Sequence, residues 1–234
     1  MITVQLPLQR RPLPEPGLVD LWVSDLAAFP LAGKPGSPGQ REQQQILKFR
    51  QRFLLRLLLG SYLDCPGKAV RFDRGPTGKP ELIPALAAGG LRFNLSHSGD
   101  WLVVAVARHS AVGVDIERRR ELPRAAALAQ RFLSPAEART VAALAEPARS
   151  ECFLNLWSRR EALVKARGGS VVSSLGDLEL DPVDGQPRRL PADWPGAPEW
   201  TLRDPSLPAG LVGAVAVAEP GWSVLTHVLE LGVP

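Results

Sequence analysis

Proline is frequent in this chain, at 23 of 234 residues, yet residues 40–63 contain none. The dense Leu and Phe content of this window predicts one long, partly buried helix that ends near Gly60. Residues 149–167 predict a second long helix. The Pro- and Gly-rich stretches 30–39 and 182–208 predict loop or irregular extended chain, and they bracket the ordered parts.

Two apolar, β-branched runs, Trp101–Ala107 and Val112–Glu117, predict strands in the middle of the chain. The four residues between them, 108–111, are expected to form the short connection of a hairpin. A further helix is expected to begin at Ser134, because this capping residue is followed by proline and, three positions later, by Glu137.

A short internal echo favours a duplicated architecture. Residues 99–108 (Gly-Asp-Trp-Leu-Val-Val-Ala-Val-Ala-Arg) resemble residues 209–218 (Ala-Gly-Leu-Val-Gly-Ala-Val-Ala-Val-Ala), and each stretch follows a long helical segment. We therefore predict an α+β fold of two halves of similar size that meet near residue 111. The N-terminal half would span residues 1–111 and the C-terminal half residues 112–234.

Composition indicates a globular protein that neither spans a membrane nor carries a signal peptide. With 45% hydrophobic residues, the chain can bury one large core or two smaller ones. Because no run approaches about 18 apolar residues and the first residues lack the order of a signal peptide, we expect a cytoplasmic protein. Cys65 and Cys152 lie in unrelated contexts and are expected to be reduced thiols rather than a disulfide or a metal pair.

Three carboxylates in two short segments indicate a site for a divalent metal ion. Asp115 and Glu117 alternate along a predicted strand, so they project from one face while their apolar neighbours point to the core. Glu161 lies on the second helix, where steps of about 100° per residue place it in one stripe with Lys165. Three nearby anions require a cation, and oxygen ligands suit Mg²⁺ or Mn²⁺ better than zinc. The alternative from spacing alone is solvated strand-end acids beside an ordinary helical Glu–Lys pair.

Basic side chains cluster between residues 41 and 79, where nine basic and three acidic side chains give a local net charge of +6. Such a patch favours a polyanionic partner, whether a phosphorylated small molecule, an acidic protein or nucleic acid. Aromatic residues do not alternate with these charges and no nucleic-acid-binding signature occurs, so nucleic acid is the weakest of the three. The alternative is a solvated basic helix face.

Four motifs follow one another along residues 75–178. They include Gly75-Pro-Thr-Gly-Lys-Pro80, Phe93-Asn-Leu-Ser-His-Ser-Gly99, Val112-Gly-Val-Asp-Ile-Glu117 and Phe153-Leu-Asn-Leu-Trp-Ser-Arg-Arg-Glu-Ala-Leu-Val-Lys165. In composition and order they closely resemble the 4′-phosphopantetheinyl transferases of the surfactin-synthetase-activating (Sfp) type. The resemblance implies a monomer of two similar halves related by a pseudo-twofold axis, with coenzyme A in the cleft between them. It further implies Mg²⁺-dependent transfer of the 4′-phosphopantetheine group to a serine of an apo carrier protein, with adenosine 3′,5′-bisphosphate as the second product.

The resemblance also implies roles for residues on the C-terminal side. Asp115, Glu117 and Glu161 match the metal-binding acids, and Asp115 would thereby contact the coenzyme as well. Glu161 is the candidate acceptor of the serine proton, directly or through a water on the metal. Lys165 would stabilise charge on the leaving pyrophosphate group, the alternative being a simple pairing with Glu161.

On the N-terminal side the implied contacts are to coenzyme A. His97 matches the family histidine at the 3′-phosphate, where Ser96 can supply a hydroxyl, and Lys79 resembles the lysine at the adenine-nucleotide end. The alternative for His97 is a strand-end core residue. Basic residues of the first long helix are further candidates for the 3′-phosphate, without individual assignment: Arg41, Lys48, Arg52 and Arg56.

Two positions depart from the family pattern. Arg160 stands where the family usually has lysine, which keeps the charge but changes the geometry of any phosphate contact. After Lys165 the usual Gly-Lys-Gly-Leu turn is replaced by the sequence of residues 167–171, in which Arg167 is a candidate substitute for the missing lysine.

The expected partners are coenzyme A and an apo acyl carrier protein or peptidyl carrier domain, without nucleic acid or membrane. Because such carriers are acidic, the docking surface is expected among the basic and apolar residues after the metal-binding strand. These are Arg118, Arg119, Arg120, Arg124, Leu122 and Phe132, for which the alternative is a solvated loop. Two rival functions are a non-catalytic coenzyme A or carrier-binding module and a metal-dependent nuclease or phosphohydrolase. All three acids are present, which favours the transferase.

Overall fold

The computed structural model describes residues 1–29, 39–75, 78–169, 178–181, 184–191, 194 and 200–230. Its helices are α1 (Gln40–Leu63), α2 (Pro84–Ala87), α3 (Ala125–Phe132), α4 (Pro135–Ala143) and α5 (Ala148–Arg167), with the 3₁₀ turns η1 (Leu26–Ala28) and η2 (Gly67–Ala69). Its strands are β1 (Ile2–Gln5), β2 (Leu18–Asp25), β3 (Phe72–Arg74), β4 (Pro80–Leu82), β5 (Leu91–Ser98), β6 (Trp101–Arg108), β7 (Val112–Arg118), β8 (Glu179–Leu180), β9 (Pro187–Arg189), β10 (Thr201–Arg203), β11 (Leu211–Val217) and β12 (Ser223–Glu230).

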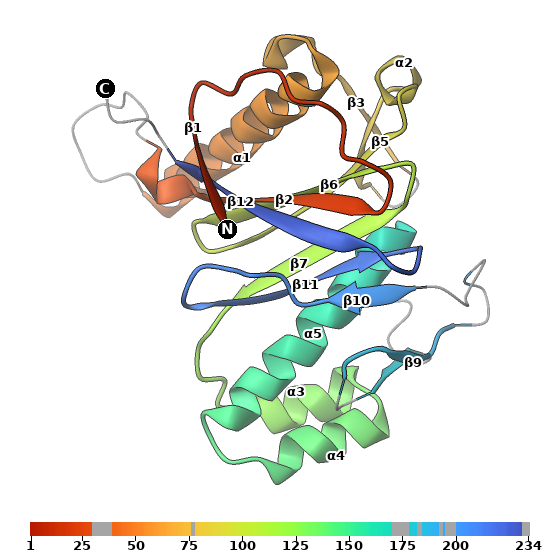
Figure 1. The fold of residues 1–234 in the computed structure, drawn as a ribbon. Helices are drawn as coiled ribbons and strands as arrows, with labels where there is room; N and C mark the ends of the chain where they lie inside the picture. The colour runs from red at the N-terminus through yellow and green to blue at the C-terminus, as the bar shows by residue number, and fades with distance from the viewer. Residues whose placement is uncertain are drawn as a thin grey trace.

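Two sheets and two long helices stack in layers (Figure 1). One sheet has the strand order β1-β12-β2-β6-β5 and the other has the order β10-β11-β7. Helix α1 covers the outer face of the first sheet, and α5 covers the outer face of the second. The inner faces of the two sheets share a third core. The predicted mixed α+β class is therefore confirmed.

The alternation of side chains along β6 explains why its sequence is apolar throughout. Leu102 and Val104 pack in the core beneath α1, whereas Val103 and Ala105 pack in the core between the two sheets. A strand that is buried on both faces needs apolar residues at every position.

The predicted helices are confirmed with small differences at their ends. Helix α1 extends three residues past Gly60, to Leu63, and α5 begins one residue earlier than expected. Helix α4 begins as predicted: the Ser134 hydroxyl accepts the amide of Glu137 at 3.3 Å, and the Glu137 carboxylate accepts the amide of Ser134 at 2.9 Å.

The predicted hairpin between β6 and β7 is wrong. Both edges of β6 are already paired, with β2 and with β5, so no edge remains for β7. The chain instead passes to the other sheet, where β7 pairs antiparallel with β11. His109 in this connection adopts a left-handed conformation, with a φ of 68°.

The C-terminal strand returns to the first sheet. β12 pairs parallel with both β1 and β2, so it completes the first sheet although it follows all strands of the second. The sheets therefore do not divide at residue 111, because one strand of the predicted C-terminal half lies in the N-terminal sheet.

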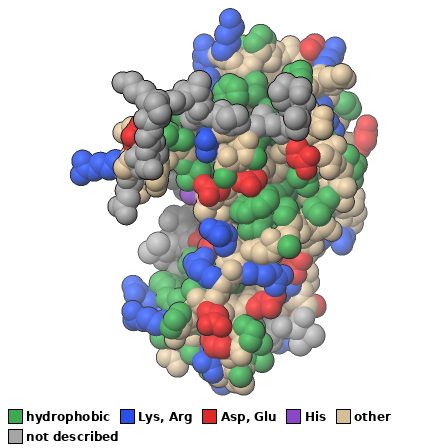
Figure 2. Space-filling view, turned by 90° about the vertical axis from the view of Figure 1, so that its left-hand side faces the viewer, with side chains coloured by type: hydrophobic (Ala, Val, Ile, Leu, Met, Phe, Trp, Pro, Cys, Tyr) green, Lys and Arg blue, Asp and Glu red, His purple; other side chains and the backbone are tan. Residues whose placement is uncertain are grey.

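The described surface is indented between the part that carries α1 and the part that carries α3 and α4 (Figure 2). Of the Pro- and Gly-rich stretches, residues 30–38 lie outside the described residues. The described parts of 182–208 hold the short strands β9 and β10 and no helix. Within the described chain, no helix combines the length and apolar character needed to cross a membrane.

Candidate active site

A hollow of about 400 Å³ opens where β5, β7 and α5 meet. Its lining residues are Leu95, Ser96, His97, Asp115, Ile116, Glu117, Trp157, Glu161 and Lys165. The fold thus brings the three predicted metal-binding acids, the lysine, and the Ser-His pair to one place from three separate elements.

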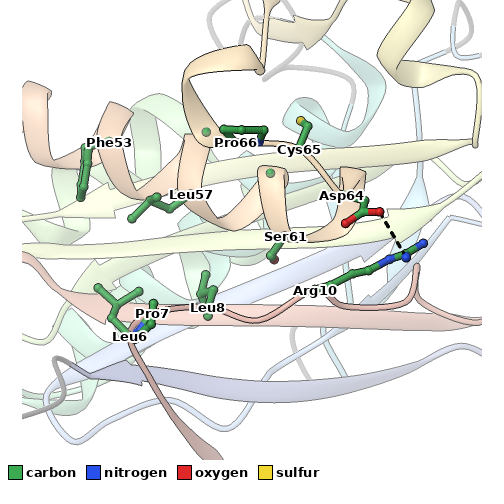
Figure 3. A pocket seen from close by; sticks show the side chains of 12 residues that line it. Leu6, Pro7, Leu8, Arg10, Phe53, Leu57, Ser61, Asp64, Cys65 and Pro66 are labelled. Atoms are coloured by element: carbon green, nitrogen blue, oxygen red, sulfur yellow. Dashed lines mark ion pairs between the residues drawn. The ribbon is translucent and has the colours of Figure 1, made fainter.

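A larger hollow of about 680 Å³ lies elsewhere, between residues 6–10 and the C-terminal end of α1 (Figure 3). Its lining is mostly apolar, and the one ion pair drawn there joins Arg10 to Asp64 at 3.2 Å. None of the predicted site residues lines it. The smaller hollow is therefore the candidate active site, because it holds the groups that can do chemistry.

Glycine at position 113 allows β7 to lie close to α5. A Cβ at Gly113 would stand 2.0 Å from the carbonyl oxygen of Ala162 and 2.3 Å from the amide nitrogen of Ala166. No other residue fits without moving the helix. Asp115 and Glu117, two and four positions further along the strand, share this face and are thereby directed towards α5.

Asp115 joins α5 and β5 through hydrogen bonds within the site. Its Oδ1 accepts hydrogen bonds from Lys165 Nζ at 2.6 Å and from Ser96 Oγ at 2.7 Å. Lys165 Nζ also donates to Ser96 Oγ at 3.1 Å. Burial raises the pKa of Asp115, and Lys165 and Ser96 oppose that rise. Oδ2 of Asp115 is buried without a hydrogen-bond partner among the described residues, so its desolvation is not compensated.

Glu117 lies near the C-terminal end of the same strand. Its Oε2 accepts a hydrogen bond from Ser98 Oγ at 3.1 Å and lies 3.5 Å from Arg120 Nη1. Burial raises the pKa of Glu117, and the negative charge of Asp115 adds to the rise.

Glu161 faces these acids from α5. Burial raises its pKa to about 7; Lys165 opposes the rise, whereas Asp115 and Glu117 add to it. A carboxyl group with this pKa can accept a proton near neutral pH. In this conformation the described residues include no group of three or more His, Cys, Asp or Glu side chains arranged to hold a metal ion.

A basic hollow of about 630 Å³ adjoins the acidic one, since Leu95 lines both. Three of the four candidate basic residues of α1 line it, namely Lys48, Arg52 and Arg56, together with Arg74 of β3. Arg41 lies exposed in the first turn of α1 and is not among the lining residues.

Lys79 lines neither of these hollows; it lines a separate one of about 230 Å³ beside the last turn of α5. Its Nζ donates to the carbonyl oxygen of Lys165 at 3.0 Å, in the last turn of α5. Burial lowers the pKa of Lys79 to about 8; Glu81 opposes this change, while Lys165 and Arg92 add to it. The lysine therefore ties the Gly-Lys-Pro motif to the helix that carries Lys165.

The comparisons with known proteins identify the family of this chain. The family model of the 4′-phosphopantetheinyl transferase superfamily matches residues 111–208, and that of the 4′-phosphopantetheinyl transferase N-terminal region matches residues 40–109. The 4′-phosphopantetheinyl transferase HetI of a Nostoc species is 34% identical over 171 residues, which are 73% of this chain and 70% of the relative. This chain belongs to the 4′-phosphopantetheinyl transferase superfamily.

Two further relatives also match more than half of the chain. The 4′-phosphopantetheinyl transferase AcpT of Escherichia coli K12 is 36% identical over 148 residues, which are 63% of this chain and 71% of the relative. The human L-aminoadipate-semialdehyde dehydrogenase-phosphopantetheinyl transferase is 26% identical over 226 residues, which are 86% of this chain and 73% of the relative. The predicted superfamily is confirmed, and the finer assignment to the surfactin-synthetase-activating type stays a prediction.

One predicted site residue of this superfamily member requires correction. Arg160 is fully buried and forms an ion pair with Glu137 of α4. It also donates to the carbonyl oxygen of Leu178 at 2.7 Å. One residue along a helix turns a side chain by about 100°, so when Glu161 faces the hollow its neighbour faces the core. The arginine that replaces the usual lysine is thus paired in the core and does not line the hollow.

The expected docking residues divide into two groups. Leu122 and Phe132 line an apolar hollow of about 180 Å³ beside Glu117 and Arg120. Arg119, in contrast, forms an ion pair with Glu151, and its Nε donates to the carbonyl oxygen of Leu211 at 3.2 Å.

Sequence reasoning missed Ser98 and Asn94 of β5. Ser98 binds Glu117, and Asn94 Oδ1 accepts the amide of Val114 at 2.8 Å. The signal was present in the alternation of polar residues along the motif Phe93–Ser98, which places Asn94, Ser96 and Ser98 on one face of a strand.

Proposed function

We propose that this chain transfers the 4′-phosphopantetheine group of coenzyme A to a serine hydroxyl of an apo acyl or peptidyl carrier protein. The serine oxygen forms a bond to the phosphorus of the pantetheine phosphate, the pyrophosphate P–O bond breaks, and adenosine 3′,5′-bisphosphate leaves. The observation that carries the proposal is the joint placement of Asp115, Glu161 and Lys165 in one hollow. Membership of the superfamily supports it independently.

The side chains of the hollow have distinct tasks in this reaction. Glu161 lines the hollow from α5 and is the candidate acceptor of the proton that the serine hydroxyl loses. Lys165 neutralises charge that develops on the leaving phosphate, while its bond to Asp115 fixes the position of its ammonium group. The site therefore acts by positioning and by electrostatic stabilisation, without a covalent intermediate.

Asp115, Glu117 and Glu161 would hold a divalent cation, for which Mg²⁺ or Mn²⁺ is the suited choice. The donor set fits such an ion in two respects. Oδ2 of Asp115 is buried without a partner among the described residues, and burial raises the pKa of all three acids. Repulsion from neighbouring acids adds to the rise for Glu117 and Glu161. When bound, the ion supplies positive charge to the pyrophosphate oxygens.

The basic hollow on α1 is the proposed site of the 3′-phosphate and the nucleotide. Lys48 and Arg52 supply positive charge there, and Gln51 has a buried amide nitrogen without a partner among the described residues. His97 lines the neighbouring acidic hollow and can contact the same phosphate from the other side. Coenzyme A would thus extend from the basic hollow to the acids.

The proposed cleft lies between two structural repeats related by a pseudo-twofold axis within one monomer. Two segments of the chain support this proposal, because each contains a strand, a long helix and two further strands. They are β2, α1, β5 and β6, and then β7, α5, β10 and β11. In both segments the last strand lies between the other two. The echo between residues 99–108 and 209–218 corresponds to these two central strands.

An acidic carrier protein would dock beside Glu117. The apolar hollow that holds Leu122 and Phe132 is also lined by this acid and by Arg120, and Arg124 is exposed just before α3. Electrostatic attraction would guide the carrier, and apolar contacts would hold it with the serine directed at Glu161.

Intact-protein mass spectrometry of an apo carrier protein tests the proposal. Incubation with this chain, coenzyme A and Mg²⁺ should add one phosphopantetheinyl group, and Glu161→Ala should abolish the addition. If acyl and peptidyl carriers both stay unmodified although coenzyme A binds, the chain is a binding module and the proposal is wrong.

A further inference from the structure

Three alternate residues of β5 connect the two sheets at the active site. β5 and β7 belong to different sheets and share no backbone ladder in the described structure. Instead, Asn94 Oδ1 accepts the amide of Val114, Ser96 Oγ donates to Asp115, and Ser98 Oγ donates to Glu117. We call Asn94, Ser96 and Ser98 the polar ladder.

We propose that the polar ladder positions the two strand acids for metal binding, with Ser98 as the positioning residue of Glu117. The proposal rests on the proposed function, since it concerns the same site. Its central point is that each serine holds one carboxylate oxygen of an acid and leaves the other oxygen available as a ligand.

The hydroxyl orientations follow from the neighbouring donors. A serine hydroxyl has one proton to donate. Ser98 Oγ accepts the amide of Arg118 at 3.1 Å, so its own proton is directed to Oε2 of Glu117. Ser96 Oγ likewise accepts from Lys165 Nζ, which directs its proton to Oδ1 of Asp115. Each hydroxyl therefore accepts from one neighbour and donates to one acid.

The remaining oxygens are the ones that a metal needs. Oδ2 of Asp115 is buried and has no hydrogen-bond partner in the described structure. In Glu117, Ser98 and Arg120 both approach Oε2. Carboxylates that bind metals are commonly oriented by such outer hydrogen bonds, and loss of one outer partner weakens metal binding by roughly 10- to 100-fold.

Asn94 has a different task in the ladder. It binds the backbone of β7 rather than an acid, at Val114, the residue just before Asp115. It therefore fixes the position of β7 along β5. The two serines, which are two residues apart on β5, then each contact one of the two acids, which are two residues apart on β7.

A pair of variants with matched shape separates positioning from packing. Ser98→Thr keeps the hydroxyl, whereas Ser98→Val has nearly the same volume and strand preference without it. Mn²⁺ affinity is measured by electron paramagnetic resonance of the free protein, without coenzyme A or carrier. We expect Ser98→Thr to bind Mn²⁺ like the wild type and Ser98→Val to bind it roughly 10-fold more weakly.

Two further variants complete the test. Ser98→Ala should weaken Mn²⁺ binding like Ser98→Val, which keeps the test valid if the larger side chains disturb the strand. Ser61→Ala is the control, because the Ser61 hydroxyl donates to the carbonyl oxygen of Leu58 in α1, at 2.7 Å, and Ser61 does not line the acidic hollow. Its Mn²⁺ affinity should equal that of the wild type.

The outcomes distinguish the two proposals. Equal Mn²⁺ affinity in Ser98→Thr, Ser98→Val and Ser98→Ala would overturn the positioning role, as would a wild type that binds no Mn²⁺. If the expected pattern of Mn²⁺ affinities is found but the wild type modifies no carrier protein, the polar ladder stands and the proposed function fails.

Discussion

Arg160 and Glu161 are neighbours on α5, yet their surroundings are opposite in character. Arg160 is fully buried, and its charge is balanced by Glu137 and by a backbone carbonyl group. Glu161 faces a hollow in which burial raises its pKa; one lysine opposes the rise and two more acids add to it. A charge that the fold neutralises supports structure, whereas a charge that it leaves unbalanced is available for a ligand.

The same contrast separates the α4–α5 contact in the core from the acids of β7 in the hollow. The α4–α5 contact is closed, because Glu137 accepts both the arginine and the amide of Ser134 at the start of α4. At β7, in contrast, Asp115 retains a buried oxygen without a partner among the described residues. The comparison predicts that substitutions on one side change stability and those on the other change activity.

The largest effect is expected from Glu161→Gln. Loss of the carboxylate removes a proposed metal ligand and the proton acceptor, so the rate of carrier modification should fall by at least about 10²-fold. Stability should not fall, since a repelled charge is removed. The rate is measured by mass spectrometry, with Glu179→Gln as a control acid outside the hollow. A near-normal rate in Glu161→Gln would show that this acid of the hollow is not needed for activity.

Glu137→Ala should have the largest effect on stability. It leaves Arg160 buried without its carboxylate partner, which should cost about 3–5 kcal/mol of unfolding free energy. The matched control is Arg10→Met, which removes the exposed Arg10–Asp64 pair and should cost less than about 1 kcal/mol. Urea denaturation measures both, and equal losses would show that the buried pair has no special role.

Stability should depend on pH through Glu161. Its pKa rises from 4.5 to about 7 on folding, so the unfolded chain loses this proton first as the pH increases. The stability that Glu161 contributes in its protonated form is therefore lost between about pH 4.5 and 7.

Glu161→Gln has no such loss, so its melting temperature should exceed that of the wild type more at pH 8 than at pH 5. Thermal unfolding without divalent ions measures this difference, and Glu121→Gln, an exposed acid, is the control. A difference that shrinks as the pH rises would contradict the assigned environment.

The smallest effect is expected at the exposed arginines. Reversal of charge in Arg124→Glu should raise the KM for an acidic carrier by about 3-fold, because exposed charges mainly guide association. Arg139→Glu, exposed on α4, is the control. Equal KM values in the two variants would remove the docking surface beside Glu117.

The sequence allowed the local elements to be predicted better than their pairing. The proline-free window and the Ser134 cap located α1 and α4, and strand alternation placed Asp115 and Glu117 on one face. The hairpin prediction failed because strand partners depend on which edges are free, and the partners β2 and β5 of β6 are fixed by contacts distant in sequence.

The environment of Arg160 was also beyond sequence reasoning. Its partner Glu137 lies 23 residues earlier on another helix, and nothing in the local pattern distinguishes a charge paired in the core from one paired with phosphate. The family motif even favoured the wrong environment, because the lysine it usually contains at this position suggested a ligand contact. Ser98 was missed for the opposite reason, since its role depends on a neighbouring strand that belongs to another sheet.

The central claim is that the unbalanced acids of the hollow form a cation site. Calorimetric titration of Mn²⁺ into the free protein near pH 7, in two buffers of different ionisation enthalpy, measures binding and proton release together. The account predicts binding that releases part of a proton from Glu161, and loss of that release in Glu161→Gln. Absence of Mn²⁺ binding to the wild type, or equal proton release by the wild type and Glu161→Gln, would contradict the claim of a cation site.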